Sequence, residues 1–473
     1  MMTRRTLLFA ALPLAVRTAP AAPAQPLRIG SQLQLFVDDF LIESMQGATL
    51  RMHPPVSAGK VLAFDQPWEG NVSLYGTVFP DGEKMRMYYR GWSLPDYANP
   101  RLLRADEVLH PKNPGQTCYA ESKDGIQWTK PTLNLLEFNG SKANNIVWQG
   151  QGSHNFAPFL DTNPAAPPAE RYKAVGGDRQ LFAFRSADGL RWELIRKEPI
   201  LTDGAFDSLN VAFFDPLRGR YVAIYRDFGQ GIRTIKRAES ADFLNWSKGE
   251  WADYGAAPQE HFYTNATTPY FRAPQIYLAF PKRFVYWCKP VPDVPGDGIS
   301  DTVFMTSRDG LHWDRRFLEA FIRPGRDPRN WVHRTNMVMT GVLPTGDGEL
   351  SLYVQRHYNF ASAHVERMTV RTDGFASAHG DYRGGELITK PFSCEGTNLL
   401  LNFATSAWGS VRYEVLDENR QPLPGYALEQ TPVLYGDFIE KSVRLLDRPR
   451  WTRRPVRLRF VLQDADLFSL RIA

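Results

Sequence analysis

Five short segments of this sequence place hydrogen-bonding side chains beside aromatic ones, and each lies just before a run that is predicted to be a β-strand. The segments are residues 68–71, 153–155, 205–210, 262–265 and 330–334. A sugar is bound through directional hydrogen bonds to its hydroxyl groups and through an apolar face that stacks on an aromatic ring. Each of the five segments therefore has the residue types that a carbohydrate site needs.

Two side chains in the five segments are acidic, Glu69 and Asp207. Cleavage of a glycosidic bond usually needs two carboxyl groups, one that protonates the leaving oxygen and one that activates water or attacks the sugar. We predict that Glu69 and Asp207 are this pair. Glu69 is assigned as the acid and Asp207 as the base, and the reverse assignment remains open.

Further residues of these segments are predicted to bind the substrate. Tyr263 and Trp331 could stack on a sugar ring or could be ordinary core aromatics. The planar fork of Arg334 suits a carboxylate or phosphate, and the alternative is a structural salt bridge. His154 could bind a hydroxyl group, raise the acidity of a neighbour, or be a buried and satisfied histidine. The full predicted set is Asn71, His154, Asn155, Asn210, Tyr263, Asn265, Trp331 and Arg334.

A short pattern, Ser-x-Asp-Gly-x-x-Trp, recurs along the chain. It occurs at 122–128, 186–192 and 307–313, with a variant at 240–246 and a degenerate copy at 371–375, about 62 residues apart on average. Serine and aspartate side chains bond to the nearby backbone, and glycine accepts a positive φ. We interpret the pattern as a hairpin turn anchored by tryptophan, and its aspartates as structural.

Alternating runs that are typical of strands lie between these turns, at 84–90, 171–175, 220–226, 275–280 and 349–355. Five repeats with several short strands each predict an all-β chain that contains a five-bladed β-propeller, with an array of β-sandwiches as the alternative. The repeat ends near residue 391, and four further strand-like runs follow. We predict a propeller over 25–390 and a small β-sandwich over 391–473.

The turns, the five repeats and the final β-sandwich together resemble the five-bladed propeller glycoside hydrolases, which include arabinanases, invertases and levansucrases. The segment Leu-Phe-Val-Asp-Asp-Phe-Leu-Ile at 35–42 looks like the opening of an uncharacterised bacterial branch of that group. The Asn-Asp-Pro-Asn-Gly motif of the invertase relatives is absent. The resemblance implies that ligands bind where the innermost strands begin, beside the central channel, and that bond cleavage proceeds with inversion.

Asp39 is a further candidate for the catalytic base, together with its neighbour Asp38. It would serve as the base if the chain begins inside the first blade of the propeller. The alternative is that this acidic pair forms a turn that closes the propeller.

Three functions remain open. The first is a glycoside hydrolase that acts on a polysaccharide or oligosaccharide. The second is a glycoside phosphorylase, which needs a basic cluster near the acid; Arg334, Arg283 and His357 are the residues that hint at one. The third is a carbohydrate-binding propeller without catalysis, in which Glu69 and Asp207 would not meet or would each be held in salt bridges.

The amino terminus carries the pattern of an export signal. Arg4 and Arg5 precede a short apolar run, and small residues follow up to residue 24. This order is typical of a signal peptide, and the paired arginines resemble a twin-arginine signal, with an ordinary secretory signal as the alternative. We expect a periplasmic or extracellular protein that begins near Gln25.

Composition and motifs exclude several other classes. The chain has 473 residues, of which 43% are hydrophobic, and a net charge of +5 from 56 basic and 51 acidic residues. This balance is unlike that of a disordered chain or a nucleic-acid-binding protein. No phosphate-binding loop, dinucleotide fingerprint, zinc-protease motif or nucleophile elbow occurs. We predict no cofactor and no metal, although the resemblance would allow a structural calcium, and we expect a monomer.

Three cysteines, Cys118, Cys288 and Cys394, lie far apart in the sequence. Their spacing gives no support to a zinc site. One disulfide with a free thiol and three unpaired thiols both remain open.

Overall fold

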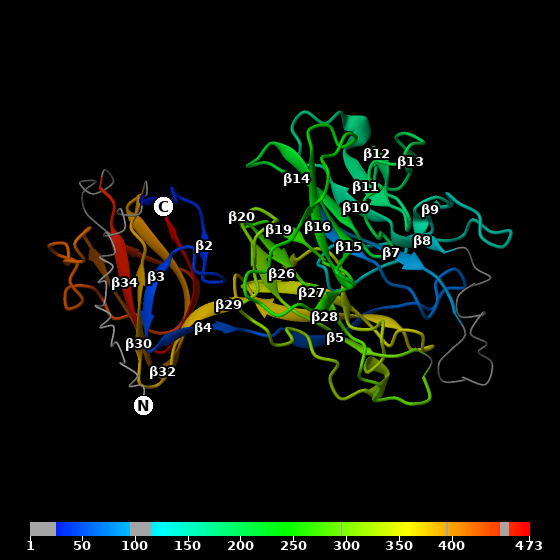
Figure 1. Cartoon of the computed structure of the whole chain (residues 1–473). Coiled ribbons are helices and arrows are strands. Elements are labelled where there is room, and N and C mark those ends of the chain that lie inside the picture. Colours follow the sequence, from blue (N-terminus) through cyan, green and yellow to red (C-terminus); the bar gives the residue numbers. More distant parts are fainter. Residues whose placement is uncertain (1–24, 95–114, 295, 394–395, 445–453) are drawn as a thin grey trace, which may run out of the picture.

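A computed structural model shows two β-structured parts side by side (Figure 1). The structure describes residues 25–94, 115–294, 296–393, 396–444 and 454–473. Within these residues the helices are three short 3-10 turns, η2 (Ser153–Asn155), η3 (Pro168–Glu170) and η4 (Pro328–Asn330). The prediction of an all-β propeller with a second β domain is confirmed. The predicted export signal and Cys394 lie outside the described residues.

The larger part contains six sheets, which we group into five blades because a three-stranded sheet continues the fourth blade. Successive strands within a sheet pair with one another and run antiparallel. The first sheet contains β6 (Thr77–Asp81), β7 (Lys84–Gly91), β8 (Gln116–Ser122) and β9 (Ile146–Gln149). The second contains β10 (Ala157–Leu160), β11 (Tyr172–Gly176), β12 (Phe182–Ser186) and β13 (Glu193–Leu194). The third contains β14 (Val211–Asp215), β15 (Arg220–Gly229), β16 (Ile232–Ser240) and β17 (Glu250–Trp251).

The fourth and fifth sheets depart from this simple order. The fourth contains β19 (Thr268–Tyr270), β20 (Ala273–Ala279), β23 (Met305–Ser307) and β24 (Trp313–Asp314). A three-stranded sheet extends it, made of β18 (His261–Phe262), β21 (Lys282–Val285) and β22 (Ile299–Thr302). The fifth contains β25 (Met337–Val338), β26 (Leu343–Gly346), β27 (Glu349–Arg356), β28 (His364–Arg371) and β5 (Val56–Ala63). The fifth sheet therefore takes its outer strand, β5, from early in the chain.

The innermost strands of the five sheets surround a common channel. A cavity of about 80 Å³ is lined by residues from all five, among them Thr77, Ala157, Val211, Thr268 and Gly341. The circle closes between the first and fifth sheets, where the backbone of Val78 donates a hydrogen bond to Thr340, 2.8 Å long.

The predicted turns join the third strand of a sheet to the fourth. In the turn at 307–313, the Asp309 carboxylate accepts two backbone N–H bonds of 2.8 Å, and the Trp313 indole donates to the Gly310 carbonyl at 3.0 Å. The copies at 122–128 and 186–192 have the same bonds. In the variant turn, Phe243 adopts the positive φ (68°) that glycine has elsewhere. The structural interpretation of this motif is confirmed.

The smaller part is an eight-stranded sheet that folds around its own apolar core. Strands β32 and β34 are long and shift register at bulges, which lets the sheet bend over a core that includes Phe403, Tyr413 and Phe460. Its strands are β2 (Gln34–Leu35), β3 (Ile42–Gln46), β4 (Ala48–Met52), β29 (Ala376–Gly380), β30 (Gly385–Thr389), β32 (Asn398–Leu416), β33 (Asp437–Arg444) and β34 (Arg457–Ile472). Strand β1 (Leu27–Arg28) pairs with β31 (Phe392–Ser393) nearby.

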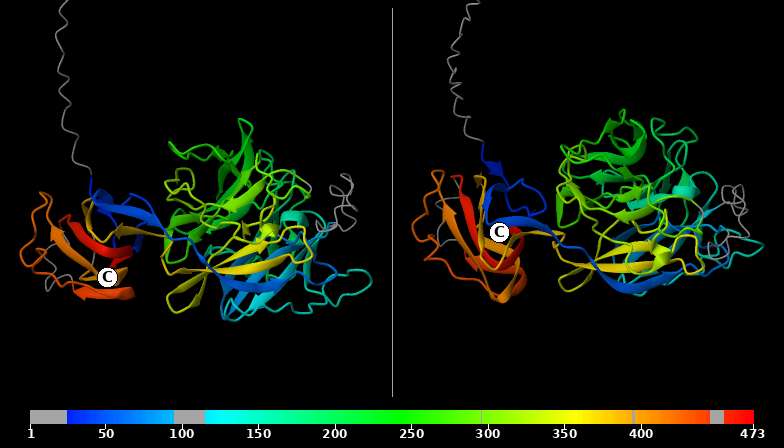
Figure 2. Two further views of the ribbon diagram at one scale, coloured as in Figure 1. Left: turned by 90° about the horizontal axis from the view of Figure 1, so that it is seen from below. Right: turned by 60° about the horizontal axis from the view of Figure 1, so that its bottom comes forward.

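This pairing corrects the predicted division of the chain. Strands β2, β3 and β4, which were expected in the propeller, pair with β34, β30 and β29 of the smaller part. The described residues therefore begin in the smaller domain. The chain crosses to the propeller between β4 and β5 and returns between β28 and β29, as the two views of Figure 2 show. Among the described residues, no helix has the length and apolar character needed to cross a membrane.

Candidate functional site

A polar and aromatic cluster lies at one end of the propeller channel, where innermost strands begin. Because the strands of a blade are antiparallel, the start of the first strand adjoins the end of the second. Arg90, at the end of β7, thus donates its backbone N–H to Leu74, 2.8 Å away and just before β6. We call this group the mouth cluster. Its members are Tyr75, Arg90, Trp92, His154, Asp207, Arg226, Arg233, Tyr263, Lys282, Arg334 and Tyr358.

Asp207 is the carboxylate of this cluster. One of its oxygens lies 3.4 Å from His154 Nε2, and the other accepts a 3.4 Å hydrogen bond from the Tyr263 hydroxyl. Burial works to raise the pKa of this carboxyl. The hydrogen bond from His154 and the charges of Arg226 and Arg90 outweigh burial and hold the pKa well below its usual range. The Asp207 side chain is 57% exposed, so the cluster presents an ionised carboxylate to solvent.

Two buried asparagines hold the loop that carries Asp207. The side-chain amide of Asn155 donates to the carbonyls of Phe206 and Ser208, at 2.7 and 2.8 Å. Asn210 donates to the same two carbonyls at 2.8 and 3.0 Å. Both asparagines were predicted to bind substrate, and both are only 1% exposed. They position the loop instead.

His154 lies between Asp207 and Arg90. An Arg90 nitrogen is 2.9 Å from His154 Nε2 and 3.3 Å from Nδ1. This nitrogen is too close to both ring nitrogens to lie on the lone-pair axis of either one. Burial, followed by the charge of Arg90, lowers the pKa of His154 against the opposing effect of Asp207. At neutral pH the ring is therefore neutral and can donate one hydrogen bond toward Asp207.

Two tyrosines complete the acidic side of the cluster. The hydroxyls of Tyr75 and Tyr263 lie 3.0 Å apart. Burial and the charge of Asp207 raise the pKa of Tyr263, and burial raises that of Tyr75 further. Both phenols therefore keep their protons at neutral pH.

The basic side of the cluster surrounds the ring of Tyr263. Lys282 Nζ lies 4.5 Å from the ring centroid, and the guanidinium carbons of Arg226 and Arg233 lie 4.9 and 6.0 Å from it. Arg334 donates to the Tyr358 hydroxyl at 3.2 Å. Within the described part of the chain, none of these four cations has a carboxylate within 4.0 Å.

Glu69 is not part of this cluster, which corrects the predicted catalytic pair. Its side chain is fully buried. One oxygen accepts a 2.5 Å hydrogen bond from Tyr89, while the other lies 2.7 Å from Lys130 and accepts the backbone N–H of Gln66. Both oxygens are occupied inside the first sheet, so Glu69 serves as a structural ion pair.

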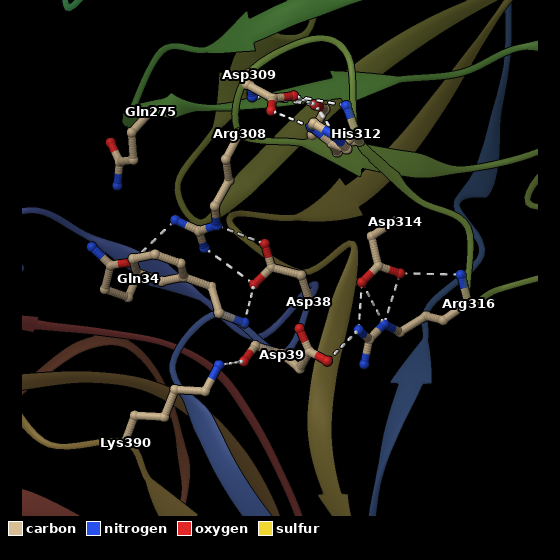
Figure 3. A network of polar contacts seen from close by, with 12 residues as sticks. Gln34, Asp38, Asp39, Gln275, Arg308, Asp309, His312, Asp314, Arg316 and Lys390 are labelled. Carbon is tan, nitrogen blue, oxygen red and sulfur yellow. Dashed lines mark hydrogen bonds and ion pairs between the residues drawn. The ribbon is translucent and has the colours of Figure 1, made fainter. Parts of the chain in front are cut away.

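Asp39 lies beside Arg316 and Lys390, with its neighbour Asp38 beside Arg308 (Figure 3). Its neighbour Asp38 pairs with Arg308 at 2.7 and 3.1 Å, and Asp39 lies 3.5 Å from Arg316. Lys390 donates to the Asp39 backbone carbonyl at 2.9 Å. The acidic pair therefore connects the smaller domain to the outer turn of the fourth blade, and its predicted role as a base is wrong.

Three more predicted residues form local contacts away from the cluster. Asn71 bonds the backbone of Leu94 through both ends of its amide, at 2.8 and 2.9 Å. Asn265 is 1% exposed and donates to a carbonyl of β15. The Trp331 indole donates to a loop carbonyl at 2.9 Å.

The two residues expected to assist Arg334 form ion pairs elsewhere. Arg283 pairs with Glu260 and Asp301 at 2.8 and 2.7 Å, and His357 Nε2 lies 3.2 Å from Asp327. Neither contributes to the mouth cluster.

Four predicted residues do lie in the mouth cluster, namely His154, Asp207, Tyr263 and Arg334. Most of the residues that sequence reasoning missed follow or end second strands rather than precede first strands. A signal was present, since two of the predicted strands end in Tyr-Arg, at Arg90 and Arg226. Since the end of a blade's second strand adjoins the start of its first strand, a search of both places would have found both arginines.

No metal-binding group of three or more histidine, cysteine, aspartate or glutamate side chains occurs among the described residues. Cys118 and Cys288 are free thiols.

No family model matches this chain, and no curated protein matches its sequence. Solved structures do match. A glycoside hydrolase is 14% identical, with 67% of this chain and 92% of that chain covered and a TM-score of 0.45. The β-1,2-mannobiose phosphorylase from Listeria innocua is 12% identical, with 68% and 97% covered and a TM-score of 0.45.

An arabinoxylan arabinofuranohydrolase from Bacillus subtilis is 8% identical, with 88% of this chain and 99% of that chain covered and a TM-score of 0.41.

Proposed function

We propose that this protein is a carbohydrate-active enzyme that breaks glycosidic bonds at the mouth of the propeller channel, with Asp207 as the reacting carboxylate. One observation carries the proposal. A half-exposed, ionised carboxylate lies among aromatic rings and hydrogen-bond donors where five innermost strands begin. Such a mixture of donors and rings suits a sugar.

The charge state of Asp207 selects its role. A general acid needs a raised pKa so that it holds a proton, whereas the pKa of Asp207 is held low. Asp207 is therefore suited to the second carboxylate role in glycoside cleavage, that of base or nucleophile. His154 and Tyr263 act as positioning residues, because their contacts at 3.4 Å orient its two oxygens. Asp207 keeps its assignment as base, whereas the buried ion pair with Lys130 removes Glu69 as its partner. This separation of Glu69 from Asp207 is also what the alternative of a binding propeller predicts, so the activity screen decides between the two.

The test is an activity screen on residues 25–473 with plant, algal and bacterial polysaccharides and aryl glycosides. Products are identified by mass spectrometry for the wild type, Asp207→Asn and Asp39→Asn. Asp39 is a matched control, because its side chain is 73% exposed and lies in the interdomain contact. We expect Asp207→Asn to lose activity by about a hundredfold or more, and Asp39→Asn to keep it.

Two outcomes would overturn this function. Equal activity of Asp207→Asn and wild type would remove Asp207 from the chemistry. Glycan binding without any bond cleavage across the panel would make the propeller a binding module.

Export is a further part of the proposal. The sequence 1–24 has the order of a signal peptide, and an exported enzyme would meet polymeric carbohydrate outside the cytoplasm. Fractionation of cells that express the full chain, with amino-terminal sequencing of the product, tests this. We expect a periplasmic or extracellular protein that begins near Gln25, and an uncleaved cytoplasmic product would contradict it.

A further inference from the structure

We infer that the mouth cluster contains an oxyanion-binding subsite, formed by Arg226, Arg233 and Arg334, that selects a negatively charged group at the site of cleavage. The inference deepens the proposed function and rests on it for the identity of the site. It follows from an excess of positive charge that the fold leaves uncompensated in one place.

The excess is visible in the partners of each cation. Arg226 donates from Nε to the backbone carbonyl of Ala205 at 2.7 Å, and Lys282 donates to the carbonyl of His333 at 3.2 Å. Neutral carbonyls orient a cation, but they do not cancel its charge. Arg90, Arg226, Arg233 and Lys282 interact with Asp207, and Arg334 interacts with Arg233 and Lys282. Among the residues of the mouth cluster, Asp207 is the one carboxylate.

Hydrogen-bonding capacity is left over as well. The Nε atoms of Arg233 and Arg90 are buried without a hydrogen-bond partner among the described residues. Among the described residues, the Arg334 side chain has one hydrogen-bond partner, the Tyr358 hydroxyl at 3.2 Å. A buried donor without a partner is costly, and an anion in the cluster would offset that cost.

The neighbouring arginines show that this is not a general feature of the fourth blade. Arg283 follows Lys282 directly on β21, and it is fully paired with Glu260 and Asp301. Arg315 also pairs with Glu260. Cations on the outer side of this blade are neutralised, whereas those that face the mouth are not.

Desolvated like charges alter the state of Lys282. Burial, followed by the charges of Arg334, Arg233 and Arg226, lowers its pKa well below the usual value, against the smaller opposing effect of Asp207. A bound oxyanion would oppose this shift in pKa, because it favours the protonated ammonium. Lys282, 4.5 Å from the centroid of the Tyr263 ring, therefore adds to the positive charge beside the three arginines.

The chemistry of the ligand follows from the donors. Guanidinium forks match planar carboxylates and tetrahedral phosphates or sulfates through paired N–H bonds. Two sources share this chemistry: an acidic substituent on the sugar, such as a uronate carboxylate or a sulfate ester, and free inorganic phosphate. Binding measurements can separate them.

The first experiment measures binding by calorimetry to the mature protein. The probes are inorganic phosphate, inorganic sulfate, galacturonate and glucuronate, with galactose and glucose as neutral partners. We expect an anion to bind and its neutral partner to bind at least about tenfold more weakly, since a charged hydrogen bond contributes that much or more. Preference for the uronates identifies a sugar substituent, and preference for phosphate identifies the free ion.

Variants test the residues. Arg334→Gln and Arg226→Gln are each expected to weaken anion binding by about tenfold or more. Arg191→Gln is the matched control, because Arg191 is 72% exposed and pairs with Asp188 in an outer turn. Thermal unfolding of the wild type, with and without each probe, keeps the test valid if a variant fails to fold. Absence of binding and of stabilisation by every anion would overturn the inference.

The activity panel separates this inference from the proposed function. Cleavage of neutral polysaccharides only, without an effect of anions, would overturn the subsite and leave the function standing. Anion binding without cleavage of any substrate would overturn the proposed function and leave the subsite standing. Cleavage confined to acidic polysaccharides, or dependent on phosphate, would support both.

Discussion

The outer turns recur at the same place in several blades, and so do the positions of the mouth cluster. The two regions differ in whether the residues at those places are also the same. The turns at 122–128, 186–192 and 307–313 repeat the same residues and the same bonds. The mouth instead has Tyr75 in the first blade, Asp207 before the third and Arg334 before the fifth. A bond that several blades repeat supports the fold, and a position that each blade fills differently is free to serve a ligand.

The turns also join neighbouring blades, which explains why they repeat. The Tyr88 hydroxyl of the first blade donates to Gly189 in the turn of the second, at 2.8 Å. Tyr353 of the fifth blade donates in the same way to Gly125 of the first, at 2.6 Å. The turns therefore serve to stabilise the fold. Variants in the turns should lower the free energy of unfolding, whereas variants in the mouth cluster should weaken ligand binding.

The largest effect is expected for Trp313→Ala in an outer turn. Trp313 is 3% exposed, and truncation of a buried tryptophan costs about 3–5 kcal/mol of unfolding free energy. Denaturant unfolding followed by circular dichroism measures it. Trp331→Ala is the control, because that side chain lies partly exposed beside a loop. Equal loss in both variants would contradict a special role for the turn.

Glu69→Gln should cost about 3 kcal/mol, because it leaves Lys130 partly buried without its closest carboxylate. The same unfolding experiment measures it, and Glu69→Gln combined with Lys130→Met should recover part of the loss. A variant with normal stability and no activity would instead restore Glu69 to a catalytic role.

The sequence predicts local features well and distant pairings poorly. The turn at 307–313 depends on bonds between residues at most five apart, so its pattern is readable. The position of Glu69 depends on Lys130, 61 residues away, and nothing near Glu69 indicates that partner. Asp38 depends on Arg308, 270 residues away, and β2 pairs with the last strand of the chain.

The candidate site shows the same limit. His154, Asp207, Tyr263 and Arg334 precede first strands, and this simple rule was sufficient to find them. Trp92 and Tyr358 follow second strands, so they require knowledge of which strand ends adjoin which strand starts. Charge excess is a property of the assembled cluster, since Arg226 is ordinary until its surroundings are known.

Asp309→Ala should have a smaller effect, about 1 kcal/mol, because the carboxylate accepts two backbone bonds in a partly exposed turn. Hydrogen bonds from His312 and the backbone outweigh burial and lower the pKa of Asp309 to about 2. Its contribution is therefore present above the unfolded pKa of about 3.9 and is lost as pH falls from about 4 to 2. Unfolding of Asp309→Ala across this range should be less sensitive to acid than that of the wild type.

The smallest effect on stability is expected in the mouth cluster, for Arg334→Gln. Unlike the variants above, it should not lower the free energy of unfolding. Removal of one of several like charges should leave the free energy of unfolding unchanged or raise it by about 0.5 kcal/mol. Lys282 gives this a pH signature. Because its pKa in the folded protein lies below that of the unfolded chain, near 10.4, the unfolded chain binds more protons between the two values.

The contribution of Lys282 to stability therefore rises with pH through that window. The titratable and charged groups that face Lys282 are Arg226, Arg233, Arg334, His333, Asp207 and Tyr263. Arg334→Gln should weaken the pH dependence by raising the pKa of Lys282, and a saturating anion should weaken it in the wild type for the same reason. Thermal unfolding from neutral to mildly alkaline pH measures both, with Arg191→Gln as the unchanged control. A destabilised Arg334→Gln variant with an unchanged pH profile would show instead that the mouth cluster, like the turns, serves to stabilise the fold.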